Sequence, residues 1–109
     1  MAQFDVHKNP GKHREAIPYV VIVQSSLFDS YRRRVVIPLV HSSHLDNAAA
    51  LASSSLNPAF TIKGIKVELH PLEIVSVATG QLGEKVASLA KADDRITSAM
   101  DELLTRAWA

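Results

Sequence analysis

The sequence predicts a mainly β protein with one C-terminal α-helix, arranged as a small antiparallel barrel or a strongly bent sheet. Two observations carry this prediction. Short apolar stretches rich in β-branched residues alternate with turn-forming residues over residues 1–77. The spacing of apolar residues then becomes helical over residues 93–109. A chain of 109 residues can bury one core, and we expect a single domain spanning residues 1–109.

Two strands and a loop are expected at the start of the chain. Residues 1–6 predict a short strand that places Phe4 and Val6 on one face. Residues 7–15 are polar and carry Asn-Pro-Gly, which predicts a mobile basic loop. Residues 17–24 are β-branched and aromatic almost throughout, so they predict the first strong strand.

A connecting turn and a third strand come next. Residues 25–31 form the turn, yet they include the apolar Leu27 and Phe28. Apolar residues exposed in a turn can mark an interface. Residues 35–40 predict the third strand, in which Pro38 lacks the N–H that a strand donates. We therefore expect an edge position or a bulge at that proline.

The middle of the chain predicts a short helix and a hairpin. A Ser- and Ala-rich segment holds the helix over residues 45–52. Residues 60–62 and 65–69 alternate apolar and polar side chains on either side of Lys63 and Gly64. Two turn residues between alternating segments indicate a β-hairpin.

The last third of the chain changes from strand to helix. Residues 72–77 predict another strand, and residues 80–89 predict a helical turn or two from the spacing of their apolar side chains. Residues 93–109 predict the final helix, with Asp93 or Asp94 as cap at its positive end. The apolar stripe of this helix consists of Ile96, Met100, Leu103, Leu104 and Ala107.

Composition and motifs give no sign of catalysis. There are no cysteines, so disulfides and thiolate metal sites are excluded. The net charge of +1 does not favour binding nucleic acid by bulk charge. We expect a cytoplasmic protein, because no apolar run approaches the roughly 20 residues of a membrane span and no signal peptide opens the chain. No Gly-rich phosphate loop or catalytic triad is present, and we expect no cofactor, no catalytic residue and no enzyme.

The charged and imidazole side chains have plain structural interpretations. His41 and His44 are three residues apart, but no carboxylate stands at a matching spacing, so we expect surface or turn histidines and no metal site. The three arginines at 32–34 can grip an anion. A solvated turn before a strand is the interpretation that we favour for them.

Several segments of the chain match one known family. The most specific is RRVVIPL at residues 33–39. The others are QFDV at 3–6, VVIVQS at 20–25, and residues 56–62, 83–89 and 94–99. With these segments the sequence closely resembles the CcdB toxins of toxin–antitoxin pairs, over nearly the whole chain. The resemblance implies a CcdB/MazF-type fold, in which an SH3-like barrel with a C-terminal helix forms a homodimer.

The resemblance also implies a function. CcdB toxins bind the A subunit of DNA gyrase and trap the enzyme on cleaved DNA, without any chemistry of their own. A CcdA-like antitoxin neutralises them through a disordered tail that folds on binding. Toxin and antitoxin together repress their operon and maintain the plasmid, and operator DNA is bound only by this complex. No membrane partner is implied.

The family's gyrase contact comes from a terminal Trp-Gly-Ile and from the turn after the second strand. Here that turn supplies Ser25 and Leu27, whereas the chain ends in Trp108 and Ala109. An ungapped match places the family's tryptophan on Thr105. These five residues are the expected gyrase-binding residues, and the resemblance assigns no antitoxin-binding residue.

Two alternatives stay open at the level of sequence. A MazF/Kid-type endoribonuclease toxin could use His7, His13 and the arginines at 32–34. A homologue that binds its antitoxin but no longer poisons gyrase is also consistent with the altered end of the chain, in which no Gly-Ile follows Trp108. The sequence does not decide between gyrase and topoisomerase IV as the target.

Overall fold

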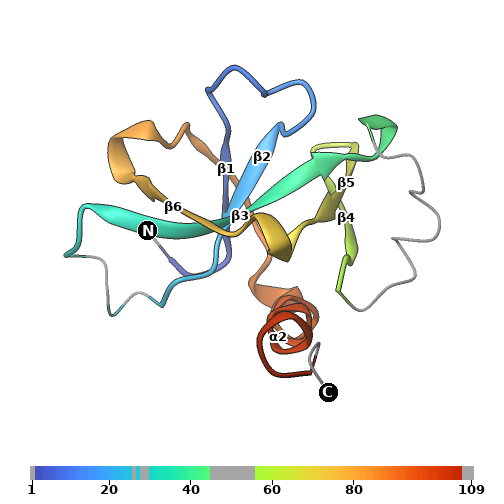
Figure 1. The fold of residues 1–109 in the computed structure, drawn as a ribbon. Helices are drawn as coiled ribbons and strands as arrows, with labels where there is room; N and C mark the ends of the chain where they lie inside the picture. Colours follow the sequence, from blue (N-terminus) through green and yellow to red (C-terminus); the bar gives the residue numbers. More distant parts are fainter. Residues whose placement is uncertain (1, 26, 28–29, 45–55, 107–109) are drawn as a thin grey trace.

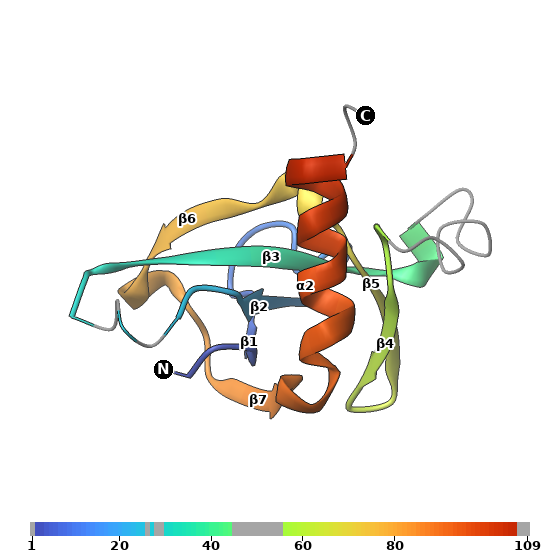
Figure 2. The ribbon, with the colours of Figure 1, turned by 90° about the horizontal axis from the view of Figure 1, so that it is seen from below.

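The computed structural model describes residues 2–25, 27, 30–44 and 56–106. In this part of the chain, seven antiparallel strands form one sheet that curls into a half-barrel beside an α-helix (Figures 1 and 2). The strand order is β4-β5-β3-β2-β1-β7, with β6 paired to β3. The strands are β1 (Asp5–Lys8), β2 (Tyr19–Ile22), β3 (Arg33–His41), β4 (Ala59–Ile62), β5 (Ile65–Leu69), β6 (Val75–Ala78) and β7 (Lys85–Ser88).

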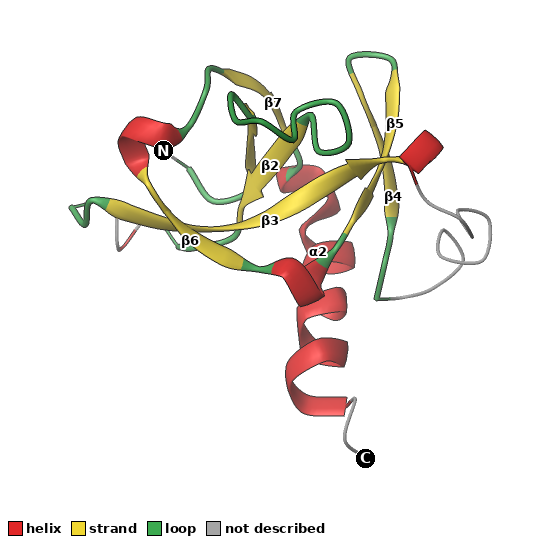
Figure 3. Cartoon of the chain, turned by 45° about the horizontal axis from the view of Figure 1, so that its top comes forward, coloured by secondary structure: helices red, strands yellow, loops and turns green. Residues whose placement is uncertain are grey.

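Helical segments join the strands and end the chain, and Figure 3 shows them in red. The main helix is α2 (Asp93–Asp101), and it continues directly into the π-helical η6 (Glu102–Arg106). The short 3₁₀ segments are η2 (Ser42–His44), η3 (Pro71–Glu73), η4 (Thr79–Gln81) and η5 (Ala90–Ala92). The mainly β fold with one C-terminal helix is therefore confirmed. No helix in the described ranges is long and apolar enough to cross a membrane.

The concave face of the sheet, called the inner face, packs against α2. From the helix, Ile96 and Ala99 are fully buried, and Met100 packs against the same core. The opposite face of the sheet is called the outer face. The buried core residues are Phe4, Val6, Tyr19, Val21, Val23, Ile37, Leu39, Phe60, Ile62, Val67, Leu69, Ile96 and Ala99.

The hairpin predicted at Lys63 and Gly64 is confirmed. It joins β4 to β5, and the register pairs Ile62 with Ile65 across the turn. Lys63 has φ +52° and Gly64 has φ +82°. A two-residue hairpin turn with positive φ at both positions matches the right-handed twist of the strands, which explains the glycine at the second position.

Pro38 does not mark an edge strand or a bulge. β3 is an interior strand whose first part pairs with β6, at Val36 and before, and whose last part pairs with β5, from Leu39 onward. Pro38 lies between these two ladders, and its carbonyl accepts the N–H of His70 at 3.1 Å. The missing N–H therefore falls where the sheet needs no donor.

The helical turns predicted for residues 80–89 are wrong, because β7 runs through this segment. The N–H of Gly83 donates to Lys8 O at 3.0 Å, so the chain joins the edge of β1. A Cβ atom on Gly83 would lie 2.7 Å from the same oxygen, so only glycine allows this approach. The helix predicted at 45–52 lies outside the described residues, and the strand predicted at 72–77 begins later, as β6.

The start of α2 falls at Asp93, as predicted, but no aspartate caps it from outside. The N-cap position is Ala92, which has no side-chain acceptor. Asp93 and Asp94 instead lie in the first turn and accept the N–H of the next residue at 2.9 Å. Both carboxylates also suit the positive end of the helix dipole. Leu104 leaves the predicted stripe and is 65% exposed, because the wider π-helical turn of η6 changes the direction of the side chains.

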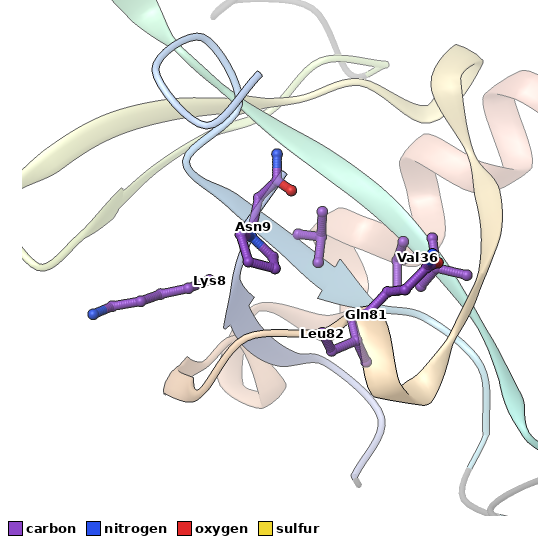
Figure 4. Close-up of a pocket in the computed structure, with 8 residues that line it drawn as sticks. Lys8, Asn9, Val36, Gln81 and Leu82 are labelled. Atoms are coloured by element: carbon purple, nitrogen blue, oxygen red, sulfur yellow. The ribbon is translucent and has the colours of Figure 1, made fainter. Parts of the chain in front are cut away.

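The outer face holds a small apolar pocket under the β6–η4 segment. Its volume is about 50 Å³. Figure 4 shows Val36 and Leu82 within it and Lys8, Asn9 and Gln81 at its sides. The complete lining is Lys8, Asn9, Pro10, Val20, Val36, Val77, Gln81 and Leu82. The pocket is too small for more than part of one side chain, so we regard it as a packing defect of the outer face.

Candidate functional site

The turn between β2 and β3 presents an apolar side chain to solvent. Leu27 is 86% exposed, which makes it the most exposed large apolar residue of the described chain. Its backbone N–H donates to Ser25 Oγ at 3.2 Å. This hydrogen bond, which the serine hydroxyl accepts, holds the backbone N–H of Leu27 in place. Ser25 therefore positions the backbone of Leu27, whose exposed apolar side chain is available for contact.

Two glutamine side chains hold the base of this turn. The amide of Gln24 accepts the N–H of Val35 at 3.2 Å, which ties the end of β2 to β3. Gln3 Nε2 donates to Val23 O at 3.1 Å from the opposite side. The sequence reasoning assigned neither role. Only the pairing of β2 with β3 brings these amides to the turn.

Two of the arginines at 32–34 serve the same end of the sheet. Arg34 is only 4% exposed, and its Nη1 donates to Tyr31 O at 2.6 Å and to Arg33 O at 2.8 Å. Arg33 is exposed and reaches β6, where Nε donates to Ser76 Oγ at 2.8 Å and Nη2 to Ser76 O at 2.7 Å. The sequence favoured a solvated turn for these arginines. That interpretation is wrong for Arg33 and Arg34, because both belong to β3 and donate hydrogen bonds to other protein groups.

The other half of the predicted site lies at the end of the helix. Thr105 belongs to η6, whereas Trp108 and Ala109 lie outside the described residues, as does Phe28 of the turn. The turn between β2 and β3 and the end of η6 lie on different sides of the chain in two perpendicular views (Figures 1 and 2). Within the described part of one chain, the β2–β3 turn therefore does not lie beside the end of η6.

A second exposed apolar surface, called the η3–β6 patch, lies near the end of the helix. Leu72 is 74% exposed, Val75 is 47% exposed and Ile74 is also exposed. η3 lies beside the helix in Figures 1 and 2, and η6 there carries the exposed Leu104. Four large apolar side chains on neighbouring elements are more than the isolated exposure of ordinary surfaces.

The residues of the ribonuclease alternative are not brought together. His7 is buried, with Nδ1 at 2.9 Å from Gly83 O. His7 pairs with Val20 of β2, which in turn pairs with Pro38 of β3. Pro38 is five residues, or about 16 Å, from Arg33 along β3. His13 lies exposed in the β1–β2 loop. A general acid and base must both reach one phosphate, and this arrangement does not provide that.

A wide polar groove opens between β1, β7 and the hairpin tip. Lys8, Lys63 and Lys85 line it together with Glu84. The ammonium of Lys8 lies 2.9 Å from the Glu84 carboxylate. This contact lowers the pKa of Glu84 and raises the pKa of Lys8. Lys85 pairs with Asp5 at 3.3 Å. Because two of the three cations already have partners, the groove offers little free charge to a ligand.

The described part of the chain gives no support for a metal site. No group of three or more His, Asp, Glu or Cys side chains converges there. His41 Nδ1 is used locally, since it accepts the N–H of Ser43 at 3.1 Å. His41 is the last residue of β3 and not part of the turn that follows it.

Comparisons with known proteins place this arrangement. No curated protein matches the sequence significantly. Among solved structures, the chain is similar to an endoribonuclease in complex with its cognate antitoxin from a mycobacterial species. That match has 13% identity and a TM-score of 0.73, and it covers 95% of this chain and 94% of the other. It shows a shared fold. The family model described as CcdB protein matches residues 3–105, and the chain therefore belongs to the CcdB family of toxins.

Proposed function

We propose that this chain is the toxin of a type II toxin–antitoxin module, and that it binds the A subunit of DNA gyrase and traps the gyrase–DNA cleavage complex. A CcdA-like antitoxin neutralises it. The observation that carries the proposal is the exposed Leu27, whose backbone N–H is held by Ser25 Oγ. The family match of the chain covers both the barrel and the helix. An exposed apolar side chain on a fixed backbone suits a binding contact, because little order remains to be gained on binding.

The proposal requires a homodimer. In one chain the turn and the end of the helix lie apart, so a shared gyrase surface needs two copies. The η3–β6 patch with Leu104 is the surface that we assign to the contact between copies. A two-fold axis through this patch would place the two helix ends side by side. The end of η6 would then lie at the centre of the dimer, and we propose that the last residues of the chain contribute to the gyrase contact there.

The toxin acts by binding alone in this proposal. The described residues hold His7 and Arg33 apart, which supports a protein without catalytic chemistry. The similar endoribonuclease was solved with its cognate antitoxin, and this supports an antitoxin partner for our chain as well. With a net charge of +1, the toxin has little attraction for DNA. Operator DNA is therefore bound by the toxin–antitoxin complex only.

A gyrase cleavage assay tests the proposal. Purified chain is incubated with gyrase, ATP and supercoiled DNA, and double-strand breaks are counted after denaturation. We expect breaks with the native chain and a loss of at least tenfold with Leu27→Ser, because the exposed contact disappears. Trp108→Ala should lose a similar amount. Lys91→Ala is the matched control, since Lys91 is exposed on η5, and it should behave as the native chain.

The same assay separates the alternatives. Topoisomerase IV in place of gyrase shows which enzyme is the target. A parallel incubation with RNA detects an endoribonuclease, and RNA cleavage without DNA breaks would replace the proposal. If the chain binds its antitoxin but causes neither DNA breaks nor RNA cleavage, it is a homologue that binds its antitoxin and no longer poisons gyrase. If Leu27→Ser still produces as many breaks as the native chain, the turn is not part of the gyrase contact.

A further inference from the structure

The outer face of β5 carries a buried acid next to a histidine. Val67 and Leu69 point to the inner core, so Glu68 points to the outer face. Glu68 is only 2% exposed. His70 is two residues further along, on the same side of the chain. Among the described residues, neither Glu68 Oε2 nor His70 Nε2 has a hydrogen-bond partner, and both atoms are buried.

Apart from His70, the described residues around Glu68 offer no compensation for a negative charge. In the register, Glu68 faces Val40 of β3 and Ala59 of β4. On the same face, Pro38 lies beside His70. Thr61 and Ser42 lie on either side of Lys66. Pro71 of η3 follows His70 in the chain. Lys66 is exposed, and its pairing with Thr61 lies toward the hairpin tip. Among the described residues, the one charged group that acts on Glu68 is His70.

Within the sheet, the hairpin that carries Glu68 is paired with the other strands along one edge only, and Arg95 of α2 contacts its other strand at Ala59 O. β4 pairs only with β5, and β5 reaches the rest of the sheet through Leu39, Val40 and His41 of β3. Such an edge hairpin can open without unfolding the whole sheet. Opening would expose Glu68 to water, where its carboxylate is hydrated.

We propose that Glu68 and His70 make the β4–β5 hairpin a proton-sensitive element, closed while Glu68 is protonated and open more often once Glu68 ionises. The physical reason is that an unpaired buried carboxylate costs far more free energy than the neutral acid. Burial accordingly raises the pKa of Glu68 above its ordinary value, and the positive form of His70 acts in the opposite sense. His70 thus sets how far the pH range of the effect extends.

The sign follows from proton linkage. The closed hairpin binds the Glu68 proton more tightly than the open one, in which the pKa is ordinary, near 4.5. Above that pH, each unit raises the opening equilibrium constant by up to about tenfold. The rise ends at the raised pKa of the closed form. At lower pH the hairpin is most stable.

Hydrogen exchange of the full chain between about pH 5 and pH 8 tests this inference, with rates corrected for the intrinsic pH dependence of exchange. We expect amides of 59–69 to open more often as the pH rises, whereas amides of β1 and β2 do not. Glu68→Gln should abolish the rise, because residue 68 then carries no ionisable group. Glu73→Gln is the matched control, since Glu73 is exposed on η3, and it should retain the native profile.

Further outcomes decide the remaining points. His70→Gln removes the opposing charge, so the rise should continue to a higher pH before it levels off. If opening in His70→Gln levels off at the same pH as in the native protein, His70 does not act on Glu68. A native profile that is flat, or a Glu68→Gln profile that rises like the native one, would overturn the inference. If Glu68→Gln does not fold, Glu68→Met serves the same purpose, since it fills the site without an amide.

Discussion

The inner and outer faces of the sheet are both buried along β3 and β5, but different kinds of side chain fill them. The inner core consists of apolar residues only, closed by α2. Every buried ionisable side chain found on a described strand alternates with these core residues and lies on the outer face. These are Asp5, His7, Arg34 and Glu68.

The difference shows how each face is stabilised. The inner face gains free energy from apolar area alone, which is insensitive to pH. On the outer face, Asp5 has Lys85 at 3.3 Å, His7 has Gly83 O at 2.9 Å, and Arg34 has two carbonyls. For Glu68 Oε2 no such partner exists among the described residues. Substitutions on the inner face should therefore act through packing, whereas substitutions of the buried ionisable side chains on the outer face should act through charge.

The largest effect is expected at the inner face from Ile96→Ala. Ile96 is fully buried where α2 meets the sheet, and truncating a buried isoleucine costs about 2–5 kcal/mol. Urea unfolding at fixed protein concentration measures the loss. Ser98→Ala, on the exposed side of the same helix, should change the free energy of unfolding by less than about 0.5 kcal/mol. Equal effects of the two substitutions would contradict the packing of α2 on this face.

A pair of neighbouring valines compares the packing of the two faces directly. Val21 is fully buried in the inner core, whereas Val20 lines the outer pocket of about 50 Å³. Val21→Ile should cost about 1–3 kcal/mol, because the added methylene has no room. Val20→Ile should be neutral or stabilise by up to about 0.8 kcal/mol, because it fills the pocket. Thermal unfolding measures both, and the opposite order would mean that the pocket does not accept a methylene.

Glu68→Met isolates the charge effect of the outer face. Because the folded-state pKa of Glu68 is raised, the contribution of Glu68 to stability is greatest below about pH 4.5, its ordinary pKa, and falls as the pH rises toward the raised pKa. Methionine has no such dependence. It should stabilise the protein by about 1–3 kcal/mol at pH 8, the cost of a buried unsatisfied group, and by less at pH 4. Chemical unfolding at both pH values measures this, and a gain that is larger at pH 4 would reverse the sign of the argument.

Much of the fold follows from local pattern. The strands at 17–24 and 35–40, the Lys63–Gly64 hairpin and the start of the helix were predictable because alternation, turn residues and helical spacing act over a few residues. β7 was not predictable in this way. Leu82, Val86 and Leu89 recur at helical spacing by coincidence, and only the close approach of Gly83 to Lys8 shows that the segment is an edge strand.

The candidate site was predictable only in part. Leu27 stands out in the sequence as an apolar residue in a turn, and the structure exposes it. Gln3 and Gln24 gave no signal, since an amide near a strand end has many possible partners until the strand pairing is known. The same holds for Glu68, whose alternation with Val67 and Leu69 looks like an ordinary exposed position of a two-faced strand. Burial of the outer face is a consequence of the tertiary fold, which local pattern does not contain.

The smallest effect is expected where the helix meets the open edge of the sheet. Leu69 N–H donates to Pro58 O, so the next pair, Ala59 and Glu68, is not hydrogen-bonded and the Ala59 carbonyl points away from β5. Arg95 Nη2 donates to this carbonyl at 2.7 Å, and its guanidinium lies 4.4 Å from the centre of the Phe60 ring. The arginine thus occupies an acceptor that an edge strand would otherwise offer to another chain.

Arg95→Ala should cost about 0.5–1 kcal/mol, because the contact is exposed and the inner core remains. Lys91→Ala should cost less, since Lys91 is exposed on the preceding turn. Thermal unfolding measures the difference, and light scattering at raised concentration measures whether the freed edge of β4 recruits other chains. A cost as large as that of Ile96→Ala would mean that polar contacts, and not apolar packing alone, hold the helix on the inner face.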